Sequence, residues 1–395
     1  MREAFFGHPL AGQMLANALR RGRLAHTYLF VGPRGVGKLR AAKAFGRVAA
    51  CRSPRGDGEL LAPCGECPSC ALLFEPGSHH DLQIVERSEV GASGRAAQPA
   101  GEEDTAPPAA TVLSQELKLR DFEAPLRLLH KAPAVAARRV LIIPEAERMD
   151  QDASGYLLKT LEEPLPRTLI ILTTTNPAGL VPTILSRCQH VHFPLVPEDV
   201  VLQALRESGV AEERAQFAAR LAAGRLELAR KLARWPDAEE FYGEVLGHLR
   251  GALSGDRLAQ MQAAEGLRRA CLRWWEFCEG QELASGASHA LEERAVRLGA
   301  PDVLAICESW LRDMLAVRLG VARAHLANQR AAEELAADAQ RFTPGQLVQR
   351  VRAAGETRRR IQQNVNTRLA LEAFALSIGP GQPVLALAGA SGGRR

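Results

Sequence analysis

Residues between Gly32 and Lys38 have the types and spacing of a loop that holds phosphate groups. Gly32, Gly35, Gly37 and Lys38 match the pattern G-x-x-x-x-G-K-[ST] up to its last position. In such a loop the glycines let backbone N–H groups form an anion-binding cup at a helix N-terminus, and the lysine reaches the outer phosphates. The last position, which supplies a hydroxyl to magnesium, is Leu39. The segment therefore predicts a phosphate-binding shape that lacks one group needed for hydrolysis.

A second buried strand, Val140–Ile143, ends where nucleotide hydrolases of this kind place a magnesium-binding acid. The position holds Pro144, which cannot coordinate a metal and has no N–H. Glu145 and Glu147 remain nearby. Because two paired magnesium contacts are missing, we expect that this chain does not hydrolyse ATP. Whether the loop still binds nucleotide passively stays open.

A group of cysteines has the spacing of a metal site. Cys64, Cys67 and Cys70 follow C-x2-C-x2-C, with prolines and a glycine that supply tight turns. Four thiolates would hold one tetrahedral zinc, and four protein ligands leave no position for a reactive water, so the site is expected to be structural. In a cytoplasmic chain this arrangement indicates metal rather than disulfides. The candidates for the fourth ligand are Cys51, His79 and His80.

Polar residues follow the later strands of the predicted sheet. Thr173–Asn176 (TTTN) ends the strand Thr168–Thr173, and polar residues at the carboxyl ends of parallel strands face a ligand crevice. Ser186, Arg187 and Cys188 precede the last strand. By itself, Arg187 is more typical of a surface ion-pair partner than of a catalytic group.

Continuous apolar runs separated by helical segments predict a parallel sheet covered on both faces. We expect an α/β domain over residues 1–195, a small helical domain over 196–240, an all-helical domain over 241–378 and a flexible tail over 379–395. The stretch 88–110 is rich in Ala, Gly, Pro and acid, which predicts a disordered insertion. The expected strands are 28–31, 82–85, 140–143, 168–173 and 191–193, and the expected helices of the first domain include 38–50, 119–130 and 155–162.

The composition is ordinary for a globular protein: 395 residues, 46% hydrophobic, 24% charged, with a net charge of +5. No run approaches the ~18 apolar residues that a membrane span needs, and no secretory core is present, so we expect a cytoplasmic protein. The mild positive charge alone does not indicate a nucleic-acid binder.

Several motifs occur in a fixed order, and together they resemble the clamp-loader branch of the AAA+ proteins. The motifs are HTYLFVGPRGVGK, CGECPSC, PGSHHDL, LLKTLEEP, TTTNP, ILSRCQ and HFPL. The resemblance is close from Phe5 to Phe193 and rests on the helical layout beyond. It implies a P-loop AAA+ domain, a helical lid and an all-α collar that holds a pentamer together.

Within that branch, Leu39 and Pro144 resemble the delta-prime type of subunit, which has lost its magnesium contacts, and not the hydrolysing gamma/tau motor. The resemblance implies that Arg187 is an arginine finger offered in trans to ATP on a neighbouring motor subunit. It also implies that Gly224 and Arg225 are remnants of a second nucleotide sensor. The implied partners are gamma/tau and delta subunits, a sliding clamp and primed DNA. The chain would then belong to the DNA polymerase III holoenzyme without being an enzyme alone.

Three alternatives remain. A gamma/tau-like motor would need a substitute magnesium ligand, for which Glu145 is the best candidate. A P-loop phosphotransferase for a small molecule would need an acceptor pocket and a lid in place of the long helical region. A zinc-dependent nucleic-acid binder would carry basic and aromatic residues around the cysteines, and Leu60–Phe74 contains no Lys or Arg.

Overall fold

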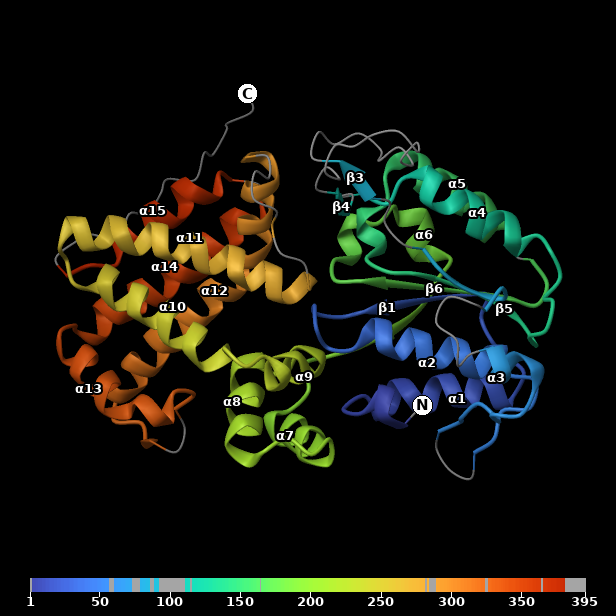
Figure 1. Ribbon diagram of the computed structural model, residues 1–395, viewed down its shortest axis with the longest axis horizontal. Helices are drawn as coiled ribbons and strands as arrows, with labels where there is room; N and C mark the ends of the chain where they lie inside the picture. The colour runs from blue at the N-terminus through green and yellow to red at the C-terminus, as the bar shows by residue number, and fades with distance from the viewer. Residues whose placement is uncertain are drawn as a thin grey trace, which may run out of the picture. The chain divides into compact units, whose positions relative to one another are not determined.

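The computed structural model divides into two compact units, Met1–Trp235 and Pro236–Arg395. Each unit is described by itself (Figure 1). The predicted further division at residue 196 stays a prediction. Of the predicted flexible tail, 379–395, residues 381–395 lie outside the described residues. The structure describes residues 2–56, 60–72, 79–85, 89–91, 111–113, 116–163, 165–280, 283, 289–323, 326–363 and 365–380.

The first unit contains a five-stranded parallel sheet with the order β2-β5-β6-β1-β7. β1 is central, pairing with β6 through Thr27 and Ile170 and with β7 through Tyr28 and Gln189. The predicted α/β class is therefore confirmed. The strands are β1 (Thr27–Val31), β2 (Leu82–Ile84), β5 (Arg139–Ile143), β6 (Thr168–Thr174) and β7 (Gln189–His192).

Helices cover both faces of this sheet, as Figure 1 shows. Alternate strand residues point to opposite sides of the sheet. Phe30 and Ile171 belong to the apolar core on one side, and Leu29 and Leu172 belong to the core on the other side. The continuous apolar strands follow from this two-sided burial. One face holds α1 (Pro9–Arg20) and α2 (Lys38–Ala50), and the other holds α4 (Leu119–Leu129), α5 (Gln151–Glu162) and α6 (Pro182–Ser186).

A short helix and a pair of short strands were not predicted. A helix of five residues, α3 (Pro68–Leu72), carries the last of the clustered cysteines. An antiparallel pair joins β3 (Glu89–Gly91) to β4 (Thr111–Leu113). The prediction of disorder starting at Ser88 is therefore wrong for residues 89–91, and residues 88 and 92–110 lie outside the described residues.

Three helices complete the first unit and pack against one another: α7 (Glu198–Glu207), α8 (Glu212–Ala222) and α9 (Leu226–Arg234). Short 3-10 turns lie at Arg2–Phe5, Ala146–Arg148 and Pro177–Gly179. The start of α9 lies on the loop between β1 and α2.

The second unit is all helical within the described residues, as predicted. Its core includes Phe241 stacked on Trp274 at 5.5 Å, and the indole Nε1 of Trp274 donates to Asp302 at 2.9 Å. None of the helices in the described part of the chain has the length and apolarity needed to cross a membrane. The helices are α10 (Ala238–Leu253), α11 (Arg257–Glu279), α12 (His289–Arg318), α13 (Ala332–Gln340), α14 (Pro344–Gln362) and α15 (Thr367–Ser377).

Candidate phosphate loop and cysteine cluster

The loop between β1 and α2 has the backbone that its glycines predict. Gly35 and Gly37 have φ values of 81° and 111°, in the left-handed region that favours glycine. A Cβ atom at Gly32 would lie 2.1 Å from the carbonyl oxygen of Phe193, which leaves no room for a side chain. The strand–loop–helix order predicted from the sequence is therefore present, and Lys38 is the first residue of α2.

Lys38 is turned back onto its own loop. Its Nζ donates to the carbonyl oxygens of Gly32 and Pro33, both at 2.7 Å, and the residue is 8% exposed. Burial lowers the pKa of Lys38 to about 8, although the nearby carboxylates of Glu147 and Glu145 oppose this shift. The ammonium group that would reach a phosphate is thus already bonded to the protein.

The start of α9 lies on the same loop. The carbonyl of Gly35 accepts from the N–H of Glu227 at 2.8 Å, and a Cβ at Gly35 would lie 3.3 Å from the Cβ of Leu228. The carboxylate of Glu227 lies 2.6 Å from Arg230 and 3.6 Å from Arg40. The helical module of the first unit therefore fixes the loop from outside.

The predicted second-sensor residues lie beside this contact. Gly224 has a φ of 81°, and the Nε of Arg225 donates to the carbonyl of Ala222 at 2.9 Å. Their assignment to a sensor stays a prediction.

The acidic residues after β5 are also engaged by protein groups. Glu145 has a φ of 48°, and its carboxylate forms an ion pair with Arg148 at 3.0 Å. Glu147 accepts from the backbone N–H and the hydroxyl of Thr175 at 3.0 and 2.6 Å. Pro144 separates these acids from β5, as the sequence predicts.

The polar end of β6 contacts the acidic segment that follows β5. Thr174 is fully buried, and its hydroxyl accepts from the N–H of Asn176 at 3.1 Å. Thr173 and Thr175 are the residues that contact the acidic segment, since the hydroxyl of Thr173 accepts from the N–H of Glu145 at 3.2 Å. Both Thr173 and Thr175 belong to the TTTN run of the sequence.

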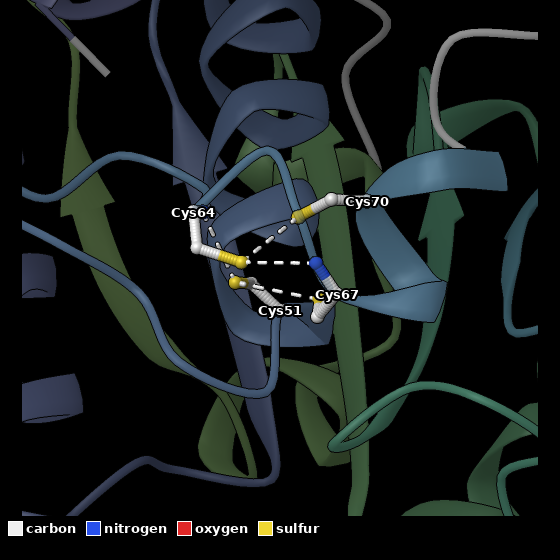
Figure 2. Close-up of side chains that lie close together, drawn as sticks. All are labelled: Cys51, Cys64, Cys67 and Cys70. Carbon is white, nitrogen blue, oxygen red and sulfur yellow. Dashed lines mark hydrogen bonds between the residues drawn. The ribbon is translucent and has the colours of Figure 1, made fainter.

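The four cysteines Cys51, Cys64, Cys67 and Cys70 lie together, and Figure 2 shows their side chains pointing towards one another. Their sulfur atoms all lie within 4.8 Å of one another. Cys51 follows α2 directly, and the N–H of Cys64 donates to its sulfur at 3.3 Å. Backbone N–H groups of Glu66 and Cys67 lower the pKa of Cys64, which favours the thiolate form. The cluster has the donors and the spacing to hold one metal ion.

His79 lies outside this cluster because both of its ring nitrogens have other partners. The Nδ1 of His79 accepts from the N–H of Asp81 at 3.1 Å, so the proton lies on Nε2, which donates to Ser69 at 3.0 Å. The geometry therefore favours Cys51 over His79 as the fourth ligand. His80 is exposed and does not join the cluster within the described residues.

Asp81 connects this region to the sheet. Its buried carboxylate accepts from the backbone N–H groups of residues 134–136 at 2.8–3.0 Å and pairs with Arg139 at 3.1 Å. Burial raises the pKa of Asp81, but the three N–H donors and Arg139 outweigh it and leave the pKa below its usual value. The segment after the cysteines is thereby fixed to the start of β5.

Arg187 directly follows α6, as its C-cap residue, and is partly exposed. Its Nη2 donates to the carboxylate of Glu162 at 3.0 Å, and its Nη1 donates to the carbonyl of Thr183 at 3.1 Å. The side chain thus lies on the protein surface with a fixed direction.

Two family models match the chain. One, described as DNA polymerase III, delta subunit, matches residues 7–197, and the other, described as its C-terminal part, matches residues 259–379. The chain is 35% identical over 183 residues to DNA polymerase III subunit gamma/tau of Mycobacterium tuberculosis. The aligned region covers 46% of this chain and 27% of that protein. It is 32% identical over 193 residues to subunit delta-prime of Bacillus subtilis, which covers 49% of each.

The match thus spans about a quarter of the first relative and about half of the second. Among solved structures, a gamma-subunit-related DNA polymerase III protein of Thermotoga maritima aligns at 16% identity with a TM-score of 0.40, covering 91% of this chain and 97% of that chain. The fold assignment rests on the sheet order and its two helical layers, not on this likeness.

Proposed function

The chain belongs to the clamp-loader subunits of DNA polymerase III, and on this premise we propose that it is the non-hydrolysing, delta-prime type of subunit. The observation that carries the proposal is the combined loss of both magnesium contacts at Leu39 and Pro144. The bonds of Lys38 to its own loop support it, since the lysine must release two carbonyl groups before it can reach a phosphate.

Arg187 is proposed as the residue that acts in catalysis, on ATP bound by a neighbouring subunit. A guanidinium placed against the transferring phosphoryl group neutralises the charge that develops on its oxygens. The partial exposure of Arg187 suits a group that reaches across a subunit interface. This subunit would complete the active site of another chain without turning over ATP itself.

Zinc is the metal proposed for the four cysteines. A set of four thiolates selects zinc among the common divalent ions, and it leaves no open position for water or substrate. The ion would fix the segment between α2 and β2, and no step of the ATPase reaction passes through it. Zinc held there supplies folding free energy rather than chemistry.

The partners that follow from this function are gamma/tau and delta subunits in a heteropentamer. The complex would open a sliding clamp and place it on primed DNA in the cytoplasm. The helices of the second unit would serve as the collar that holds the subunits together, in line with the match of residues 259–379 to the C-terminal part of the delta family.

Two measurements test the proposal. The isolated chain is expected to show no magnesium-dependent ATP turnover, and robust turnover would contradict it. In a complex reconstituted with gamma/tau and delta, Arg187→Ala is expected to lower ATP turnover about 10³-fold while assembly is retained. Arg127→Ala is the matched control, because Arg127 forms an exposed ion pair with Glu123 at 2.8 Å on α4. Unchanged turnover in Arg187→Ala would refute the finger.

The gamma/tau-type motor is the second candidate, because Glu145 stays at the end of β5. That function requires turnover by the isolated chain that Lys38→Ala abolishes. The ion pair of Glu145 with Arg148 argues against a free catalytic carboxylate.

A further inference from the structure

The guanidinium of Arg187 is held by two bonds from two different helices. Glu162, the last residue of α5, accepts from Nη2 at 3.0 Å. The carbonyl of Thr183, in the first turn of α6, accepts from Nη1 at 3.1 Å. Two anchors on separate elements fix the direction of the side chain and the plane of the group, which one ion pair would not.

The two bonds leave hydrogen-bond capacity for a ligand. A guanidinium has five N–H donors in a rigid planar fork. Within the described residues, Thr183 and Glu162 take one hydrogen from each Nη atom, and the Nε–H of Arg187 donates no hydrogen bond. The group can therefore keep both anchors while its remaining N–H donors meet phosphate oxygens, with which guanidinium groups pair bidentately.

We propose that Glu162 is a positioning residue for Arg187, holding the guanidinium in the orientation in which it meets the phosphate of a neighbouring subunit. The proposal rests on the proposed function of Arg187 as an arginine finger. An arginine side chain loses conformational entropy when it docks on a ligand. Because Glu162 orders the side chain beforehand, less of this entropy is lost on reaching the transition state.

Because the ion pair of Glu162 and Arg187 is exposed, a positioning role of Glu162 can be distinguished from a role in folding. The side chains of Arg187 and Glu162 are 37% and 55% exposed, and exposed ion pairs contribute little to folding. Substitution of Glu162 is therefore expected to leave the fold intact. Glu163, the next residue and also exposed, is the matched control on the same helix end.

The experiment measures the steady-state ATPase of the complex reconstituted with gamma/tau and delta subunits. Glu162→Gln is expected to lower kcat about fivefold, the upper end of the strength of an exposed ion pair, with KM and assembly unchanged. Glu162→Asp keeps the carboxylate and is expected to restore part of the loss. Glu163→Gln is expected to behave as the unmodified chain.

A double-mutant cycle measures whether the effect of Glu162 depends on Arg187, which a purely structural effect would not do. In the Arg187→Ala background, Glu162→Gln is expected to have no further effect, because the residue acts through Arg187. An equal loss in that background, an unchanged kcat in Glu162→Gln, or a raised kcat overturns the inference while the finger stands. A complex that is insensitive to Arg187→Ala overturns the finger and the inference with it.

Discussion

The carboxylate of Asp81 and the guanidinium of Arg139 form an ion pair of 3.1 Å in which both side chains are almost completely buried. Asp81 follows the cysteine cluster in the chain, and Arg139 is the first residue of β5. The same carboxylate also accepts three backbone N–H groups from residues 134–136. The pair therefore joins the segment that follows the cysteine cluster to β5, the strand that precedes Pro144.

Removal of the Asp81 carboxylate should destabilise the first unit strongly. Asp81→Ala leaves the buried charge of Arg139 and three backbone N–H donors without their partner, which typically costs about 3–5 kcal/mol of unfolding free energy. Urea unfolding, followed by hydrogen exchange of β5, measures the loss. Glu123→Gln, which breaks the exposed pair with Arg127, should change stability by less than about 0.5 kcal/mol. A loss below about 1 kcal/mol in Asp81→Ala would contradict this account.

The same carboxylate makes stability depend on pH. Its pKa in the folded chain lies below that in the unfolded chain, so the unfolded state binds more protons at acid pH. The contribution is fully present above the unfolded pKa of about 4 and is lost as the pH falls through the lower folded pKa. Unfolding free energies measured across this range should fall more steeply for the unmodified chain than for Asp81→Asn. Parallel curves would show that another carboxylate dominates.

Zinc binding is expected to depend on the four cysteines and not on His79. Metal analysis should give about one zinc per chain, and Cys51→Ser should lower this content, because Cys51 lies within the cluster. His79→Gln should keep the zinc, because both ring nitrogens of His79 bond to Ser69 and Asp81. Chelation should unfold the segment around α3, as followed by hydrogen exchange. A zinc-free preparation with unchanged exchange would remove the structural role.

The local parts of the fold were predictable from the sequence because they depend on near neighbours. The phosphate loop follows from its glycines, whose left-handed backbone no other residue type adopts as readily. The parallel strands follow from apolar runs that two helical layers bury. The clustering of Cys64, Cys67 and Cys70 follows from their spacing, because residues three apart in a short segment can bring their sulfur atoms together.

The remaining contacts join residues that no local pattern relates. Glu162 and Arg187 meet because α5 and α6 cover the same face of the sheet, and a sequence pattern carries no information on that packing. The contact of Glu227 with Gly35 depends on how α9 packs against the loop between β1 and α2. The choice of Cys51 over His79 required the hydrogen bonds of the histidine, since both residue types are common zinc ligands.

A last prediction concerns Arg350, a fully buried arginine of the second unit. Its Nε and Nη1 donate to the carbonyls of Ile378 and Gln346 at 2.7 and 2.8 Å, and its guanidinium lies 4.2 Å from the ring centre of Phe342. Burial lowers the pKa of Arg350 to about 10, so the residue keeps its charge at neutral pH.

Arg350→Lys should lower the unfolding free energy of the second unit by about 1–3 kcal/mol, because an ammonium cannot span carbonyls on both α14 and the end of α15 and leaves one unsatisfied. Unfolding followed by tryptophan fluorescence is suitable, since Trp274, Trp275 and Trp310 lie in this unit. Arg352→Lys is the control, because Arg352 is exposed on the same helix and should change stability by less than about 0.5 kcal/mol. Equal stabilities of the two variants would show that Arg350 fixes α15 by packing alone and not by its planar fork of donors.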